Sequence, residues 1–194
     1  MRPLLPLVVV VLVAACGGGT ATTSPRPSAS ATLPAGSSQQ PRPPGVEGKI
    51  PVRIVIPKIA VSAAVEVKGL DPDRKMQVPD DPHNVAWYYF TAVPGSAGNA
   101  VFAGHKDWYG IGPAVFYHLD QLQPGDEVQV ETQNGSVVRY RVTSEKAYDA
   151  NAAPMAEIIG RTEQPSITMY TCAGDFDSGR GEYTHRFVVR AQKA

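Results

Sequence analysis

Short apolar stretches separated by turn-forming residues dominate the chain from residue 50 onward. Residues 127–131 alternate polar and apolar positions, residues 137–142 do the same, and Asn134-Gly135 lies between the two stretches. Alternation with a period of two indicates strands with one buried face, and Asn-Gly favours the type I′ turn of a tight hairpin. The pattern therefore predicts a β-hairpin over residues 127–142.

Other segments have the composition of strands, although none is as regular as this hairpin. They cover residues 50–56, 63–67, 99–103, 166–171 and 182–189. Residues 114–122 instead have the pattern of a helix, which Pro124-Gly125-Asp126 brings to an end. Many short strands with one or two short helices predict a mainly β domain that folds as a closed or nearly closed barrel.

The first fifteen residues have a different character from this domain. Arg2 precedes an apolar stretch from residue 4 to residue 15, which is typical of a secretory signal peptide and shorter than the roughly 20 residues of a membrane-spanning helix. Val13-Ala14-Ala15-Cys16 resembles a bacterial lipobox, in which the cysteine is acylated. We therefore expect residues 1–15 to be removed and Cys16 to anchor the protein by lipid to the extracellular face of the bacterial membrane. An N-terminal transmembrane anchor is the alternative.

The stretch that follows Cys16 is composed mostly of Ser, Thr, Ala, Gly and Pro, up to about residue 48. It can bury too little apolar surface to offset the entropy lost on ordering, so we expect a solvated tether. About thirty residues in polyproline II geometry reach roughly 90 Å, at about 3.1 Å per residue. Residues 16–48 are thus predicted to hold the folded domain, residues 49–194, away from the membrane.

Composition and charge argue against several classes of function for that domain. The chain has 18 Lys and Arg against 18 Asp and Glu, and the charges are scattered rather than gathered in runs. A nucleic-acid partner calls for a basic stripe or patch, which the sequence lacks. No CxxC, HExxH or similar spacing of metal ligands occurs. We therefore expect a monomer that needs no cofactor, metal or nucleic acid.

Cys172 is the residue that most calls for an explanation. The chain has only two cysteines, and if Cys16 carries lipid, Cys172 is left as a free thiol without a disulfide partner. A free thiol outside the cell is prone to oxidation, and nucleophilic catalysis is the best reason for keeping one. A small packed side chain is the alternative. Ala173 and Gly174 leave room for a peptide to approach the sulfur.

Two other residues can act with this thiol. His105 directly follows the predicted strand 99–103 and is the best acid/base candidate among the four histidines. Arg186 lies in the last predicted strand, and a strand paired with that of Cys172 brings its guanidinium to the sulfur. Since His185 adjoins Arg186, the two side chains are expected on opposite faces of that strand.

These residues and their neighbours resemble a known family. The matching motifs are Ala103-Gly104-His105-Lys106-Asp107, Gly112-Pro113-Ala114-Val115-Phe116, Pro124-Gly125-Asp126, Thr168-Met169-Tyr170-Thr171-Cys172, Gly174-Asp175-Phe176-Asp177 and the Arg186 strand. In this order, from about residue 50 to residue 191, they resemble the sortases, thiol transpeptidases of Gram-positive cell surfaces, and most of all the class F group of actinobacteria. Tyr170 stands where the family often has a smaller or aliphatic residue, and sortases are mostly held by a transmembrane helix rather than by lipid.

The resemblance implies a fold, an activity and partners. The fold is the closed eight-stranded sortase barrel, with Cys172 as nucleophile, His105 as acid/base and Arg186 as stabiliser. The enzyme then cleaves a sorting signal similar to Leu-Pro-x-Thr-Gly through a thioester. It passes the acyl group to an amine of the peptidoglycan stem or of another surface protein. The surface proteins that carry the signal are the other partners.

Alternative interpretations keep the barrel and change the chemistry. A non-catalytic lipoprotein uses a sortase-like barrel only to bind wall peptides, and a pilin polymerase uses a lysine as the acceptor amine. An L,D-transpeptidase is disfavoured because its Ser-His-Gly-Cys-x-Arg pattern is absent. Residues 175–179 resemble a calcium loop only faintly, because the closing glutamate is missing, and a solvated loop over the cleft is the preferred interpretation.

Overall fold

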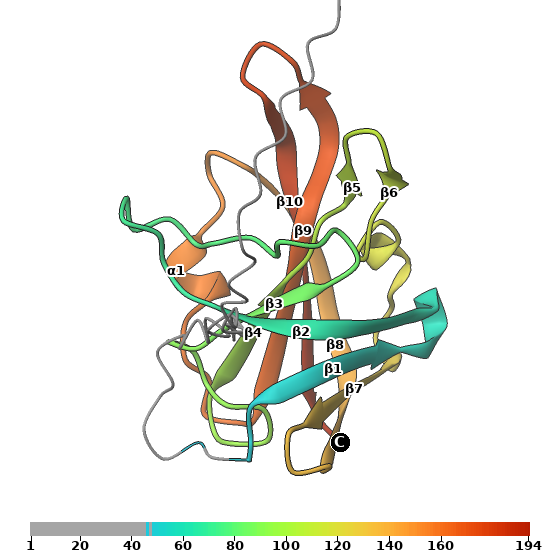
Figure 1. Cartoon of the computed structure of the whole chain (residues 1–194), viewed down its shortest axis with the longest axis vertical. Helices are drawn as coiled ribbons and strands as arrows, with labels where there is room; N and C mark the ends of the chain where they lie inside the picture. Colours follow the sequence, from blue (N-terminus) through green and yellow to red (C-terminus); the bar gives the residue numbers. More distant parts are fainter. Residues whose placement is uncertain (1–45, 47) are drawn as a thin grey trace, which may run out of the picture. The chain divides into compact units, whose positions relative to one another are not determined.

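The computed structural model describes residue 46 and residues 48–194, which are mainly β (Figure 1). The predicted signal peptide, Cys16 and nearly all of the predicted tether lie outside the described residues. The strands are β1 (Pro51–Ile56), β2 (Val61–Lys68), β3 (Val85–Tyr88), β4 (Asn99–Ala103), β5 (Asp107–Trp108), β6 (Gly112–Pro113), β7 (Glu127–Thr132), β8 (Val137–Asp149), β9 (Ser166–Asp177) and β10 (Glu182–Lys193). The helical elements are the α-helix α1 (Met155–Ile158) and the 3-10 turns η1 (Pro57–Ile59) and η2 (Leu119–Gln121).

Eight of these strands form a closed barrel in the order β1-β2-β3-β4-β9-β10-β8-β7, with β1 and β7 pairing to close it. Two neighbouring pairs, β2–β3 and β4–β9, are parallel, and the other pairs are antiparallel. The short strands β5 and β6 form a separate two-stranded sheet. The predicted mainly β, closed, eight-stranded barrel is confirmed.

The main core fills the inside of the barrel. Along β7, residues alternate between buried and half-buried positions, and Val128 and Val130 are fully buried. The largest side chains inside come from opposite walls and include Ile54, Trp87, Phe102, Tyr140 and Met169. Each fully buried side chain of this size contributes about 1.5–3 kcal/mol by leaving water. The core therefore holds in place the neighbouring strands β4 and β9, which carry candidate site residues.

A second apolar cluster lies on the opposite, outer face of β3, β4 and β9. Residues inside the barrel and residues of this cluster alternate along each of these strands, and the cluster comprises Ala86, Tyr88, Val101 and Ala103, with Tyr170, Met76 and Ile159 packed against them. Met76 belongs to the β2–β3 segment, residues 69–84, and Ile159 follows α1. Both segments therefore cover the outer face on which Tyr170, and two residues later Cys172, lie.

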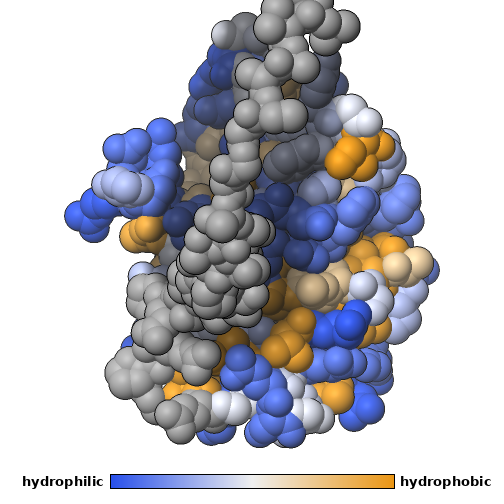
Figure 2. Space-filling model, viewed as in Figure 1, coloured by the Kyte–Doolittle hydropathy of each residue, from blue (hydrophilic) through white to orange (hydrophobic). Residues whose placement is uncertain are grey.

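One predicted element is wrong and others were missed. Residues 114–122 form turns and the short η2 rather than a helix, and α1 was not predicted. Strand β3 was missed, and β9 runs six residues beyond the predicted end at Thr171 to Asp177. No helix in the described part of the chain is both long and apolar enough to cross a membrane. The face shown in Figure 2 mixes hydrophilic and hydrophobic residues and has no single continuous apolar surface.

Candidate active site

Cys172 lies within β9, between β4 on one side and β10 on the other (Figure 1). It is half-buried and is the free cysteine of the described residues. Contrary to the prediction, the strand does not end at Cys172 but continues past a register shift between the pairs His185–Ala173 and Tyr183–Phe176. The sulfur is therefore presented from a strand that is paired with β10 at Cys172 itself and with β4 up to Tyr170, which holds its backbone in place.

Arg186 is the residue of β10 that pairs directly with Cys172. Directly opposed residues on paired strands place their side chains on the same face of the sheet, so the guanidinium and the thiol share the outer face. Nη1 of Arg186 donates to the carbonyl oxygens of Tyr183 and His185, at 3.0 Å each, and Nη2 lies 3.9 Å from Oε2 of Glu182. The structure thus brings Arg186 beside Cys172, and its own strand holds the guanidinium in place.

His105 comes to the same region from β4. The parallel register pairs Ala103 with Tyr170, so two further residues along each chain bring His105 level with Cys172. Two hydrogen bonds fix this alignment: Gly104 N–H donates to Tyr170 O at 3.3 Å, and Thr171 Oγ1 donates to Gly104 O at 2.8 Å. The structure therefore pairs Arg186 with Cys172 and places His105 just beyond the end of β4, beside the part of β9 that precedes Cys172.

The ring of His105 has its own partners in this structure. Its Nε2 is 3.2 Å from the carbonyl oxygen of Pro79, and its edge meets Trp108 with ring centroids 4.7 Å apart. A carbonyl oxygen can only accept, so Nε2 carries the hydrogen in this hydrogen bond. The ring is thus hydrogen-bonded to the β2–β3 segment, and it must leave Pro79 if Nε2 is to give a proton to another group.

The thiol of Cys172 is disfavoured as an anion in this state. Burial raises the pKa of Cys172, and the carboxylates of Asp107 and Glu182 add to that effect, whereas the nearby charges of Arg186 and Lys106 oppose it. The net direction is upward. The resting site therefore holds mostly neutral thiol, so the reactive anion is a minor species there until something changes its surroundings.

Gly174 explains how the strand continues beyond the thiol. Its φ is +75°, in the left-handed region that favours glycine. A Cβ at this position would stand 2.4 Å from Oγ1 of Thr184 and 2.5 Å from Nδ1 of His185. Any other residue here would be strained by this φ and would push the side chains of Thr184 and His185 aside, so Gly174 permits the β-bulge next to Cys172.

The β2–β3 segment that supplies Pro79 is held by one carboxylate. Oε2 of Glu66 accepts the backbone N–H of Asp80 at 3.0 Å, and Oε1 accepts the Asn84 side chain at 3.0 Å. The largely buried Lys68 ammonium lies 2.9 Å from Glu66 and 2.7 Å from Asp80. Burial acts to raise the pKa of Glu66, but these donors outweigh it and lower the pKa from 4.5 to about 2. The ionised carboxylate therefore fastens the segment that contacts His105.

This network predicts a loss of stability in acid. The folded pKa of Glu66 lies below its ordinary value, so its contribution is full above pH 4.5 and is lost as the pH falls toward 2. Glu66→Gln removes the charge, and we expect a lower free energy of unfolding at neutral pH and a smaller decline across this window. Urea denaturation at a series of pH values measures both. Glu131→Gln is the control, because its exposed pair with Arg53 at 3.6 Å contributes little. Equal pH profiles for wild type and Glu66→Gln would contradict the prediction.

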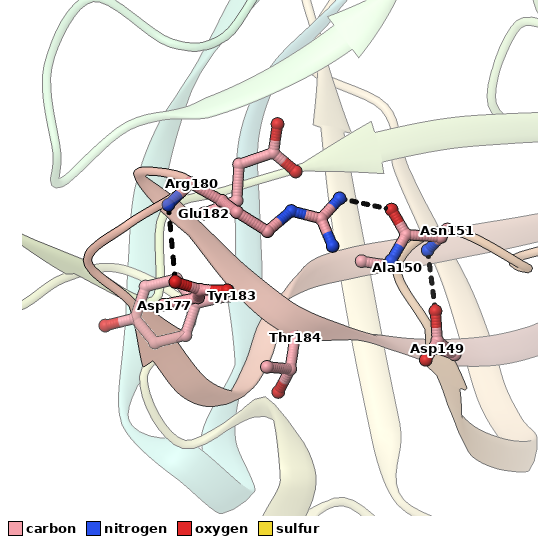
Figure 3. A pocket seen from close by; sticks show the side chains of 8 residues that line it. All are labelled: Asp149, Ala150, Asn151, Asp177, Arg180, Glu182, Tyr183 and Thr184. Carbon is pink, nitrogen blue, oxygen red and sulfur yellow. Dashed lines mark hydrogen bonds between the residues drawn. The ribbon is translucent and has the colours of Figure 1, made fainter.

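A pocket of about 150 Å³ adjoins the site at the end of the β9–β10 hairpin (Figure 3). Its lining residues are Asp149, Ala150, Asn151, Asp177, Arg180, Glu182, Tyr183 and Thr184. Arg180 donates to Oδ1 of Asn151 at 2.7 Å, and Oδ1 of Asp177 accepts the backbone N–H of Gly179 at 2.9 Å. The stretch that faintly resembled a calcium loop is therefore the tip of a hairpin, where Asp177 caps the turn.

Three residues of this region were not assigned a role from the sequence. Lys106 and Asp107 follow His105, and Tyr183 precedes Arg186. Tyr183 donates its hydroxyl hydrogen to Oδ2 of Asp107, and Nζ of Lys106 lies 3.3 Å from Gly174 O. The first two were quoted only as part of a motif, and nothing in the local sequence around Tyr183 points to a partner so far away along the chain.

Comparison with known proteins gives a family match and several structural matches. Residues 54–194 match the model of the sortase domain family. A sortase D5 transpeptidase from Clostridium perfringens is similar at 25% identity and a TM-score of 0.53, over 73% of this chain and 77% of that chain. The lid mutant of sortase A from Corynebacterium diphtheriae has 20% identity and a TM-score of 0.59, over 81% and 74%. Sortase C-1 from Actinomyces oris has 22% identity and a TM-score of 0.55, over 73% and 72%. The search of curated proteins found no match.

Proposed function

The chain belongs to the sortase family, and on that premise we propose that it is a cysteine transpeptidase of the class F group with Cys172, His105 and Arg186 as its catalytic residues. The observation that carries the proposal is the register of β9 and β10, which sets Arg186 directly opposite Cys172. The position of His105 directly beyond β4, which runs parallel to β9 with Ala103 opposite Tyr170, supports a role for the third group beside them.

The first half of the reaction forms a thioester. The Cys172 thiolate attacks the carbonyl carbon of the Thr-Gly peptide bond in a signal similar to Leu-Pro-x-Thr-Gly, and the carbonyl oxygen becomes an oxyanion. Arg186 offers a fork of N–H donors that is always charged to this oxygen. The C–N bond then breaks as the His105 imidazolium gives its proton to the departing glycine amine. The ring reaches that nitrogen by exchanging its contact with Pro79 for the substrate.

The second half of the reaction transfers the acyl group. A neutral amine attacks the thioester carbonyl carbon, His105 takes a proton from the amine nitrogen, and the C–S bond breaks to release the thiolate. The amine belongs to the peptidoglycan stem or to another surface protein. With ordinary pKa values of about 8.5 and 6.5, thiolate and imidazolium together amount to under about 1% at pH 7 if they are independent. The raised pKa of Cys172 is in keeping with a small active fraction in the resting enzyme.

The direct test is capture of the thioester. The protein is incubated with a Leu-Pro-x-Thr-Gly peptide, with and without an added amine, and analysed by mass spectrometry. We expect an acyl adduct on Cys172 that the amine converts to a new amide product. A barrel that only binds wall peptides gives no adduct, and a thiol-reactive vinyl sulfone then labels Cys172 slowly and without protection by the peptide. That outcome would replace the proposal by the non-catalytic alternative.

Loss of Arg186 should lower the rate strongly. For Arg186→Ala we expect kcat/KM to fall about 100-fold or more, because a preorganised donor to the oxyanion is lost. Arg186→Lys keeps the charge without the planar fork and should recover only part of the rate. Peptide cleavage followed by liquid chromatography measures both variants. The matched control is Arg53→Ala on β1, because Arg53 makes only exposed contacts, with Ser62 and Glu131. Full activity in Arg186→Ala would remove this residue from the mechanism.

We also propose that the protein is exported and held by lipid on Cys16 at the outer face of the membrane, with residues 16–48 as a tether. The support is the sequence of the leader and of the stretch after it. Mass spectrometry of the mature N-terminus distinguishes the two modes of anchoring. A diacylated Cys16 at the N-terminus is the expected result, and an unmodified Cys16 still joined to residues 1–15 would favour the transmembrane anchor.

A further inference from the structure

Tyr183 connects Arg186, one of the proposed catalytic residues, to the loop that carries His105. Its backbone carbonyl oxygen accepts Nη1 of Arg186 at 3.0 Å. Its hydroxyl donates to Oδ2 of Asp107, two residues after His105. The same residue therefore holds the guanidinium through its main chain and the histidine-bearing loop through its side chain.

Lys106 adds a second connection between the same two parts of the molecule. Its Nζ donates to Gly174 O at 3.3 Å and lies 4.9 Å from the centroid of the Tyr183 ring. The ring of Phe176, across the hairpin, packs against Tyr183 with centroids 5.3 Å apart. The two residues that follow His105 are thus both fastened to the β9–β10 hairpin, which carries the thiol and the guanidinium.

The loop that carries His105 needs such a support. Beyond His105 it continues as β5 and β6, which are two residues each, and Trp108, Tyr109 and Ile111 on it are exposed. A two-stranded ribbon of this size is at best marginally stable by itself. The backbone carbonyls of His105 and Lys106 accept the N–H groups of Phe116 and Ala114 at 2.9 Å each. Catalytic groups must nevertheless be held within about 0.5 Å of the productive geometry, so a further support for this loop matters.

We propose that Tyr183 and Asp107 form a clamp that positions His105 relative to Cys172 and Arg186 for the transpeptidation reaction. Both are positioning residues, because they act through the histidine loop and do not touch the reacting atoms. The expected effects on kcat rest on the proposed function. The contact between Tyr183 and Asp107 is present in the fold whether or not the protein is a transpeptidase.

The Tyr183 hydroxyl keeps its hydrogen over the pH range in which the clamp has to act. Burial and the hydrogen bond to the Asp107 carboxylate raise the pKa of Tyr183 to about 12. The phenol therefore stays a hydrogen-bond donor throughout the pH range in which a thiol and an imidazole work together. The Asp107 carboxylate is a charged acceptor, and hydrogen bonds to charged groups are stronger than those between neutral groups.

Tyr183→Phe is the sharpest variant, because it removes one oxygen and keeps the ring that packs against Phe176 and Lys106. We expect kcat to fall about tenfold with KM nearly unchanged, since misplacement of a catalytic group by about 1 Å can cost 100-fold. Tyr109→Phe makes the same chemical change on a fully exposed side chain of the same loop and should leave kcat unchanged. A kcat for Tyr183→Phe within twofold of wild type would overturn the clamp.

Two substitutions of Asp107 separate the hydrogen bond from the charge. Asp107→Asn keeps an oxygen that can accept from the Tyr183 hydroxyl, and it should retain most of the kcat. Asp107→Ala removes the acceptor and should lose as much as Tyr183→Phe. The double variant Tyr183→Phe with Asp107→Ala should be no slower than either single variant, because both remove the same interaction. Additive losses, or an equal loss in Asp107→Asn, would overturn the assignment.

Hydrogen exchange tests the clamp without any reaction. The amides of residues 105–112 should exchange faster in full-length Tyr183→Phe than in Tyr109→Phe or wild type. If the wild-type protein forms no acyl adduct, the proposed function fails, yet faster exchange still supports the clamp. If the adduct forms and the exchange rates are equal, the function stands and the clamp is refuted.

Discussion

Cys172→Ala is expected to abolish the acyl adduct and to reduce cleavage of a sorting-signal peptide to the background rate. No other thiol exists in the described part of the chain, and an alanine methyl group cannot form a thioester. Mass spectrometry of the protein after incubation with the peptide measures the adduct, and liquid chromatography measures cleavage. The fold should persist, because the side chain is half-buried and small.

Cys16→Ala is the matched control for this variant. It removes the only other cysteine of the chain, which lies in the predicted tether, so the adduct and the cleavage rate should both be preserved in detergent solution. Cleavage retained by Cys172→Ala, or an adduct found on Cys16, would remove Cys172 from its proposed role and end the transpeptidase proposal as written.

His105→Ala should lower turnover about 100-fold to 10,000-fold, the range that a positioned acid/base group contributes. The glycine amine is a poor leaving group unless it is protonated, so acylation is the step that slows. Rapid-quench measurement of the adduct in a single turnover separates this step from transfer to the amine. Added imidazole should restore part of the rate by entering the space left by the ring.

His118→Ala controls for the loss of a histidine as such. His118 is exposed and its Nδ1 pairs with Nε2 of Gln121 at 2.9 Å, away from the strand that carries the thiol. We expect its turnover to match that of wild type. If His105→Ala retained more than about a tenth of the rate, His105 would not be the group that protonates the amine.

The elements predicted best from the sequence are the strands along which polar and apolar side chains alternate. The hairpin of β7 and β8 is confirmed, with Glu131 opposite Val137. The type I′ turn is not, because that turn needs a positive φ at both central residues, and only Gly135, at +80°, has one while Asn134 does not. One face of β7 is buried and the other is not, and this asymmetry produces the alternation. Strand β3 was missed for the opposite reason: Val85 to Tyr88 are buried on both faces, so an unbroken apolar run replaces any alternation.

The spacing of the buried residues explains why residues 114–122 do not form the predicted helix. Phe116, Leu119 and Leu122 are fully buried and recur every three residues. A period of 3.0 is that of a 3-10 turn, whereas an α-helix repeats at 3.6. The segment accordingly forms successive turns that place one residue in three against the barrel, and only Leu119–Gln121 is a 3-10 helix.

The sequence singled out the candidate residues of the site, but it did not predict how these residues are arranged in space. Cys172, His105 and Arg186 were found from residue type and from the resemblance to sortases. The register that pairs Cys172 with Arg186 depends on the bulge at Gly174, which sequence patterns do not locate. The contacts of Pro79 with His105 and of Tyr183 with Asp107 join residues that lie far apart in the chain, so no local pattern predicts them.

The order of strands around the barrel also determines when, during synthesis and folding, Cys172 can pair with Arg186. Ile54 lies opposite Val130 and Phe102 opposite Met169, so most partners are far apart in the chain, and such topologies fold slowly, typically in milliseconds to seconds. Strands β9 and β10 come last in the sequence and lie between β4 and β8 in the closed barrel. Cys172 and Arg186, the nucleophile and oxyanion stabiliser of the proposal, therefore pair only after nearly the whole polypeptide has been synthesised, so an unfinished chain lacks the assembled site.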